Sequence, residues 1–132
     1  MIKAGIEIVE EHFSNRLPSM FIKVTDKDFY LPYYNEVWSM LKDNFINEYK
    51  YMIETFDCDD YALVLNAWVR QEQYRNKWVN PWAFGEAWGE FGFGKHALNF
   101  VATSDKGLRL VEPQSDEMRE INEKDIFTFI RL

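Results

Sequence analysis

The stretch that decides the fold is DCDDYALVLNAWV at residues 57–69. Asp57 is a good helix N-cap, and Asp59 and Asp60 lie in the first turn, where the helix dipole favours negative charge. From Tyr61 onward the helix is apolar on nearly every side, and a helix of that kind is buried. The sequence therefore predicts a buried central helix with Cys58 at its N-terminus.

Regular hydrophobic patterns occur on both sides of this stretch. Apolar residues at helical spacing predict two earlier helices, over residues 2–17 and 34–52, with a short strand or extended arm between them at 21–25. The later segments have the pattern of strands and cover residues 82–89, 96–103, 108–111 and 126–130. Because helices come first and antiparallel strands later, we expect one α+β domain over residues 1–132. Its N-terminal helices and its central Cys58 helix would pack on an antiparallel β-sheet.

The composition limits the classes of partner. The 132 residues include 15 basic and 22 acidic side chains, and the net charge of −7 argues against nucleic acid because phosphate contacts need a basic face. No stretch of the sequence is apolar enough to span a membrane, and acidic residues stand where a signal peptide would be apolar. The single cysteine excludes an internal disulfide. Location stays open between the cytoplasm and a phage, and the aromatic content of 17% leaves a homodimer surface open.

Cys58 is the first candidate for chemistry. A thiol at a helix N-terminus has its thiolate stabilised by the helix dipole, and the thiolate is the nucleophilic form. The carboxylates around it oppose this ionisation unless a hard divalent cation such as Ca²⁺ neutralises them; these are Asp57, Asp59 and Asp60. The alternatives are a small buried side chain at position 58 and ordinary capping by the aspartates.

A histidine and a glutamate follow on a predicted β-hairpin with its turn at residues 104–107. His96 begins the first strand and Glu112 ends the second. With the hairpin centred on Ser104 the two side chains lie abreast on one face, whereas a loop at 105–107 keeps the face but offsets them diagonally. A cysteine, a histidine and a carboxylate can act as nucleophile, base and orienting acid. His12, the other histidine, has no comparable partner.

Three segments together resemble a known superfamily. They are FDCDDYA at 56–62, HALN at 96–99 and LVEPQ at 110–114. They are similar to the Cys-x-Asp-[Phe/Tyr]-Ala box, the histidine strand and the acid-bearing strand end of papain-like and transglutaminase-like cysteine proteases. The nearest resemblance is to the calcium-dependent C-terminal protease domain of the Marasmius oreades agglutinin and to agglutinin-related proteins of bacteria and phages. It covers residues 26–114 and implies a papain-like fold.

The resemblance also implies roles for individual residues. Carried over by position, Cys58 would be the nucleophile, His96 the base and Glu112 the orienting acid. Relatives place an oxyanion donor six or seven residues before the cysteine, and here Tyr51 is the candidate for that role. The implied calcium ligands are Asp59 and Asp60, with Asp57 and Gln114 as further candidates.

The function implied by the resemblance is that of a calcium-dependent cysteine peptidase, a hydrolase acting on a peptide or protein by acyl transfer through a Cys58 thioester. Two alternatives stay open. One is a catalytically silent metal-binding or structural module of the same fold. The other is a transglutaminase-type acyltransferase, since hydrolysis and transfer use the same three side chains.

Overall fold

The computed structural model describes residues 1–92 and 94–132. The helices are α1 (Gly5–His12), α2 (Tyr34–Leu41) and α3 (Cys58–Arg75), with 3-10 turns η1 (Ser19–Phe21) and η2 (Ile46–Glu48). The strands are β1 (Ile2–Ala4), β2 (Ile22–Lys23), β3 (Asp28–Tyr30), β4 (Phe84–Glu90), β5 (Lys95–Thr103), β6 (Gly107–Glu112), β7 (Glu117–Arg119) and β8 (Ile126–Arg131).

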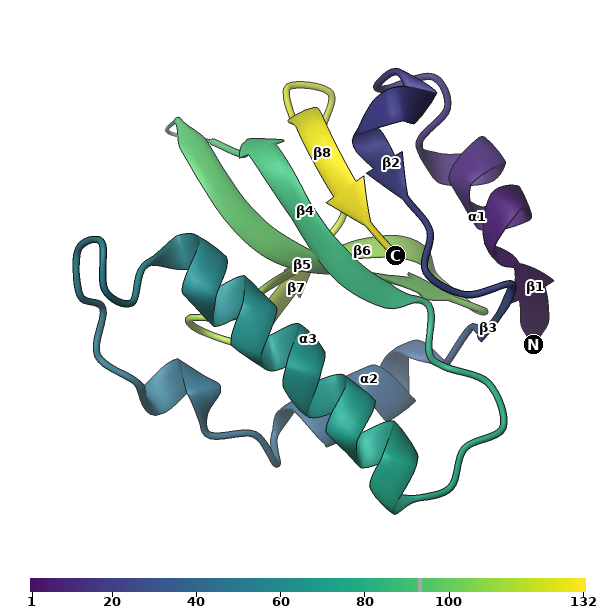
Figure 1. The fold of residues 1–132 in the computed structure, drawn as a ribbon, viewed down its shortest axis with the longest axis horizontal. Helices are drawn as coiled ribbons and strands as arrows, with labels where there is room; N and C mark the ends of the chain where they lie inside the picture. Colours follow the sequence, from purple (N-terminus) through teal and green to yellow (C-terminus); the bar gives the residue numbers. More distant parts are fainter. Residues whose placement is uncertain (93) are drawn as a thin grey trace.

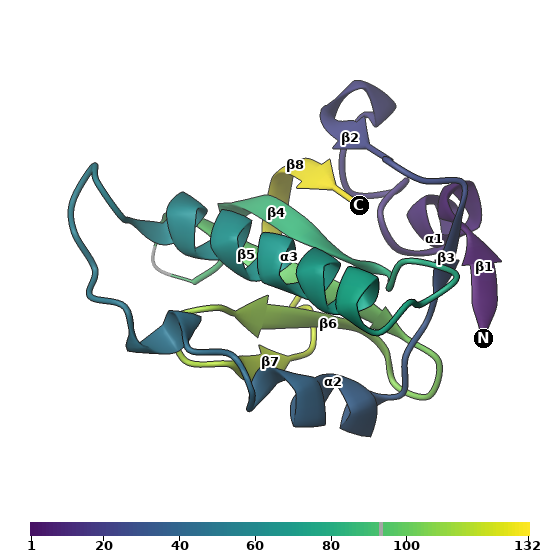
Figure 2. The same ribbon diagram turned by 60° about the horizontal axis from the view of Figure 1, so that its bottom comes forward.

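A six-stranded sheet with strand order β2-β8-β4-β5-β6-β7 forms the middle of the molecule. Helix α3 lies across β4 and β5, α2 lies beside β6 and β7, and α1 lies by β1 and β2 (Figure 1). Figure 2 shows α2 and α3 together on one side of the sheet. Two hydrophobic clusters follow from this arrangement: one joins α1 to the sheet, and the other joins α2 and α3 to it.

The sheet is mixed, which corrects the expected antiparallel sheet. β2 pairs with β8 in parallel, with Ile22 opposite Ile130, whereas the other neighbouring strands are antiparallel. Parallel partners need a long connection, and here almost the whole chain lies between them. The backbone N–H of Thr25 donates to Leu132 O at 2.7 Å and extends this pairing. The hydrophobic pattern holds no signal for such a pairing between distant segments.

The first helix is shorter than predicted. A strand, β1, takes its first residues and pairs with β3, and α1 ends at His12. Both the backbone N–H and the hydroxyl of Ser14 donate to Val9 O, at 3.0 and 3.3 Å. These local hydrogen bonds compete with continuation of the helix, which explains why it ends before Pro18.

The second helix is also shorter, since α2 ends at Leu41 and not at residue 52. Asn44 turns the chain: its backbone N–H donates to Leu41 O at 3.3 Å, and its Oδ1 accepts the backbone N–H of Ile46 at 2.9 Å. Met52 then pairs with Phe56 in an isolated β-bridge. The residues that continued the helical spacing beyond Asn44 are about half exposed or more, so this part of the apolar stripe does not face the core; they are Phe45, Tyr49 and Met52.

The central segment forms a long helix that faces the sheet on one side. α3 begins at Cys58, and Tyr61, Leu65 and Val69 are buried against the sheet. Leu63 is about half exposed, so the helix is not enclosed on every side as predicted. Among the described residues, no helix combines the length and the hydrophobicity needed to cross a membrane.

Candidate functional site

Cys58 is the first residue of α3 and is half-buried. Asn99 on β5 fixes this end of the helix, because its Nδ2 donates to Ala62 O at 2.9 Å and to Gly85 O at 3.1 Å. Asn99 is fully buried, where an unpaired amide would be costly. The sequence analysis missed this residue, although an amide in the middle of an apolar strand is a usable signal of a buried hydrogen bond.

His96 and Glu112 meet through their side chains, with 2.6 Å between Nε2 and Oε2. The β5/β6 ladder pairs Thr103 with Gly107, so His96 and Glu112 are offset diagonally. The abreast arrangement is therefore wrong. The offset is diagonal as in the alternative, although the loop covers residues 104–106 and not 105–107. Glu112 Oε1 also accepts the backbone N–H of Gln114 at 3.3 Å. Because Glu112 occupies Nε2, the imidazole has Nδ1 for another partner.

Cys58 and His96 line the same cleft, which has a volume of about 460 Å³ and is also lined by Trp88, Lys95 and Thr128. Within residues 1–92 and 94–132, no hydrogen bond joins the thiol to the imidazole. Side chains alternate along β5, so His96 shares a face with Leu98, which packs in the α1 cluster, whereas α3 covers the opposite face. The structure thus brings thiol and imidazole to one cleft without a direct hydrogen bond.

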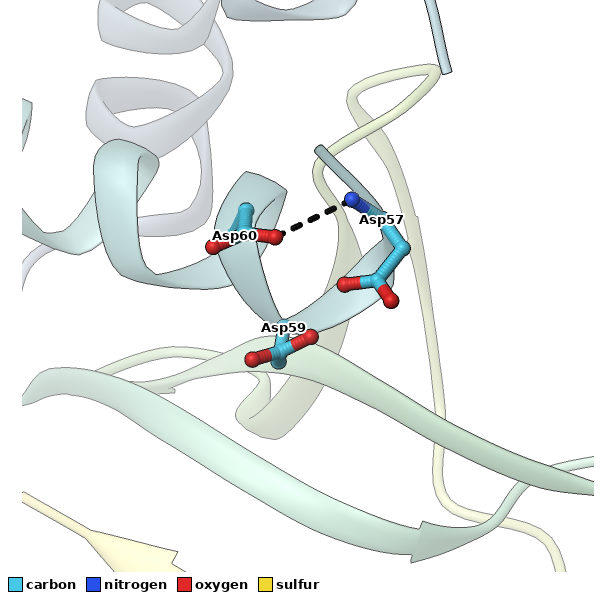
Figure 3. A group of neighbouring side chains, drawn as sticks. All are labelled: Asp57, Asp59 and Asp60. Carbon is cyan, nitrogen blue, oxygen red and sulfur yellow. Dashed lines mark hydrogen bonds between the residues drawn. The ribbon is translucent and has the colours of Figure 1, made fainter. Parts of the chain in front are cut away.

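Three carboxylates converge at the first turn of α3, as Figure 3 shows for Asp57, Asp59 and Asp60. One oxygen from each lies within 4.8 Å of the others. The backbone N–H of Asp57 donates to Asp60 Oδ2 at 3.1 Å within a capping box. A hydrogen bond with Asp59, partial loss of hydration and the nearby negative charges raise the pKa of Asp57 to about 6.

The donor chemistry of this cluster fits a hard cation. Calcium prefers carboxylate oxygens, and its charge would relieve the repulsion that raises the pKa of Asp57. The ligands that the structure brings together are Asp57, Asp59 and Asp60. Gln114, the fourth predicted ligand, lies in the turn after β6 with its backbone N–H on Glu112.

Tyr51, the oxyanion candidate, is 48% exposed and stacks on Tyr61 with 6.3 Å between ring centroids. Partial loss of hydration, followed by the negative charges of Cys58 and Asp57, raises the pKa of the Tyr51 hydroxyl. Groups near Cys58 therefore affect the ionisation of this hydroxyl, although Tyr51 does not line the cleft that Cys58 and His96 share.

Comparisons with known proteins give one family and a set of similar structures. The family model described as "Agglutinin C-terminal" matches residues 31–118. No curated protein matches the chain. A structure described as "PSL1a-E64 complex" is 19% identical with a TM-score of 0.81, and the match covers 99% of this chain and 51% of that one. The Polyporus squamosus lectin, bound to a human-type influenza-binding epitope, is 18% identical with a TM-score of 0.77, and the match covers 99% and 49%. The chain thus spans about half the length of each.

These findings correct the identification made from the sequence. That identification placed the chain among papain-like and transglutaminase-like cysteine proteases, with an agglutinin C-terminal domain as the nearest resemblance. The agglutinin relationship agrees with the matched family, Agglutinin C-terminal, whereas the protease superfamily is not what the comparisons give, since one matched structure is a lectin. The expected papain-like fold is corrected in the same way. The fold is that of PSL1a and the lectin, a β-rich domain with a mixed six-stranded sheet and short helices.

The expected function is corrected on the same grounds. The matched family is described as Agglutinin C-terminal, and one matched structure is a lectin bound to a glycan epitope. They do not support an enzyme, whether a cysteine peptidase with a peptide substrate or a transglutaminase-type acyltransferase, and they do not support a silent structural module.

Proposed function

Because the chain belongs to the Agglutinin C-terminal family, we propose that it is an agglutinin-type domain that binds calcium at the N-terminus of α3. We further propose that calcium controls the reactivity of the Cys58 thiol beside this site. The observation that carries the proposal is the convergence of three carboxylates at the first turn of α3, in which the half-buried Cys58 is the first residue. Neighbouring carboxylates repel one another and oppose the ionisation of a nearby thiol, and a bound dication reverses both effects.

The three aspartates would hold the ion, and the ion would supply positive charge next to the helix N-terminus. Asp57 and Asp60 are already fixed by capping, so part of the ligand set is ordered in advance. Asp59 is exposed and has no capping role. It is therefore the residue whose replacement tests calcium binding without disturbing the helix start. Gln114 remains a candidate ligand from the turn after β6.

His96 and Glu112 form the second part of the proposed site. Glu112 holds the imidazole through Nε2, which fixes the orientation of the ring. A fixed imidazole in the same cleft as Cys58 can accept the thiol proton by way of Nδ1 once the thiol moves toward it. The raised pKa of Tyr51 keeps its hydroxyl a neutral hydrogen-bond donor at physiological pH.

Calcium binding and thiol alkylation together test the proposal. Isothermal titration calorimetry of the whole chain with CaCl₂ should give binding that Asp59→Asn weakens. In alkylation by iodoacetamide, sulfur displaces iodide and the thiol proton leaves to the base. This reaction should be faster with calcium than with EGTA below about pH 8.5, the usual pKa of a free thiol.

Asp43→Asn, which removes an exposed carboxylate elsewhere, is the matched control and should keep both responses. His96→Ala should keep calcium binding and lose the rate increase. Absence of calcium binding in the unmodified chain, or a rate that calcium leaves unchanged, would contradict the proposal.

Glycan binding is a second candidate function, favoured by the family and by the lectin with its bound epitope. The lectin chain is about twice as long as the matched region, so its ligand is only a guide to the ligand class of this chain. A glycan array probed with the labelled chain, with and without calcium, tests this candidate. If the chain bound no glycan on the array, with or without calcium, this result would count against glycan binding.

A further inference from the structure

An aromatic cleft lies at the opposite end of α3 from Cys58. Its volume of about 370 Å³ falls in the range of roughly 300–1,000 Å³ that small-molecule sites occupy. Its walls include Tyr30, Trp78 and Trp82, and its polar groups come from Glu36 and Asn80. Since α3 has 18 residues, about 27 Å of helix separates this cleft from the aspartates.

The aromatic rings of this cleft are held in place by the fold. Trp78 stacks on Trp82 with 4.9 Å between ring centroids and an angle of 5° between ring planes. Trp82 is only 5% exposed, so it forms a fixed base for Trp78. The backbone of Tyr30 bonds to both neighbours of Trp82: its N–H donates to Pro81 O and its carbonyl accepts from Ala83, each at 2.8 Å. The surface is therefore formed before any ligand arrives.

Glu36, one of the two polar side chains at the cleft, is also held in place. Glu36 Oε1 accepts hydrogen bonds from the Tyr30 hydroxyl and from the backbone N–H of Tyr33, both at 2.9 Å. A carboxylate has acceptor capacity beyond two hydrogen bonds, and the amide of Asn80 can both donate and accept. The cleft thus offers one flat aromatic surface with a few hydrogen-bonding groups beside it.

From this geometry we propose that the cleft binds a single pyranose ring of a neutral glycan. One face of a pyranose presents C–H groups, which pack on an aromatic ring, and its rim presents hydroxyls, which bond to carboxylate and amide groups. A parallel Trp78–Trp82 stack offers a platform, whereas an ammonium ligand needs ring faces around it on several sides. The inference gives the glycan candidate a location, and it does not depend on calcium or on Cys58.

Methyl pyranosides titrated into the ¹⁵N-labelled chain test the inference. The indole N–H signal of Trp78, assigned from its loss in Trp78→Phe, should shift with at least one of methyl glucoside, galactoside, mannoside and N-acetylglucosaminide. Concentrations up to about 50 mM cover the millimolar Kd of a weak ligand. Trp78→Ala should weaken binding by about tenfold or more, and Asn80→Ala should weaken it as well.

The exposed Phe45, remote from the cleft lining, provides the matched control: Phe45→Ala should leave the Kd unchanged. Glu36→Gln keeps an acceptor for the start of α2 but loses the charge that strengthens a hydrogen bond from a sugar hydroxyl, so it should weaken binding while its melting temperature shows an intact fold. A Trp78 signal that responds to tetramethylammonium and to none of the sugars would overturn the inference. Sugar binding that survives Trp78→Ala unchanged would leave glycan binding as a function but would remove it from this cleft.

Discussion

The imidazole of His96 and the carboxylate of Glu112 form a hydrogen bond of 2.6 Å although their backbones are offset diagonally in the β5/β6 ladder. Diagonal neighbours on one face of a sheet lie within reach of long side chains. Glu112 is fixed a second time by the backbone N–H of Gln114. The imidazole is therefore oriented by the end of β6 and by the turn that follows it.

Replacing Glu112 by Gln tests this orientation. An oriented proton acceptor contributes roughly 10²–10⁴ to a rate, so Glu112→Gln should slow the calcium-stimulated alkylation of Cys58 by about tenfold or more. The pH profile of the rate should also change, which a purely structural role would not cause. Glu117→Gln, on the neighbouring strand, is the control. A Glu112→Gln variant with the rate and pH profile of the unmodified chain would show that the pair does not act on the thiol.

The acidic cluster should make stability depend on pH with a defined sign. The pKa of Asp57 is raised from 3.8 to about 6, so between these values the native state binds more protons than the unfolded state. Its contribution to the free energy of unfolding is present at low pH and is lost as pH rises through about 6. In EGTA, the melting temperature of the unmodified chain should therefore rise relative to that of Asp57→Asn as the pH falls from about 7.5 to about 5. Asn is an equally good N-cap, which makes this variant a fair reference.

Calcium should have the opposite pH dependence, because it competes with protons for the same oxygens. The increase in melting temperature on adding calcium should be larger at about pH 7.5 than at about pH 5. Differential scanning fluorimetry at both values measures it. An equal increase at both pH values would mean that the ion binds away from Asp57.

Local signals in the sequence located several parts of the structure. Helix α3 starts at the cysteine that follows a capping aspartate, and the hairpin of β5 and β6 lies where alternation and the turn residues predicted it. Both features depend on residues close together in the chain. That His96 and Glu112 lie on one face followed from their even separation in the sequence, because moving the turn changes their offset but not the face.

The remaining features depend on contacts between distant segments. The parallel pairing of Ile22 with Ile130 has no local signature, and the amide of Asn99 signals a buried hydrogen bond without naming Ala62 as its partner. The helix predicted beyond Asn44 was wrong because apolar residues can repeat at helical spacing in an exposed loop, as Phe45 and Tyr49 do. The aromatic cleft was missed for the same reason, since Tyr30 and Trp82 meet only through a bridge between separate segments.

Asn99 should be among the most sensitive positions of the core. Asn99→Leu removes both donors and leaves Ala62 O and Gly85 O without them in a buried place, where each unsatisfied group costs about 1–3 kcal/mol. We expect a loss of about 2–4 kcal/mol in the free energy of unfolding, measured by urea titration. Leu63→Ala, on the exposed side of α3, should cost no more than about 0.5 kcal/mol. A loss below about 1 kcal/mol for Asn99→Leu would show that water replaces the amide.

Gly89 should tolerate no side chain, because β4 and β8 approach each other closely at this residue. The register between the strands shifts at Trp88/Gly89, and a Cβ on Gly89 would lie 1.8 Å from Ile126 O. Gly89→Ala must therefore push the strands apart, and overpacking of this kind costs about 1–3 kcal/mol or more.

Gly89 also pairs with His96 across β4 and β5, and it lines the cleft that contains Cys58. The displacement should therefore lower the calcium-stimulated alkylation rate as well as the melting temperature. Glu90→Ala, one residue further along the strand and exposed, should leave the melting temperature nearly unchanged. If Gly89→Ala melted at the temperature of the unmodified chain, the close approach of β4 to β8 would be wrong, and with it the placement of His96 at the mouth of this cleft.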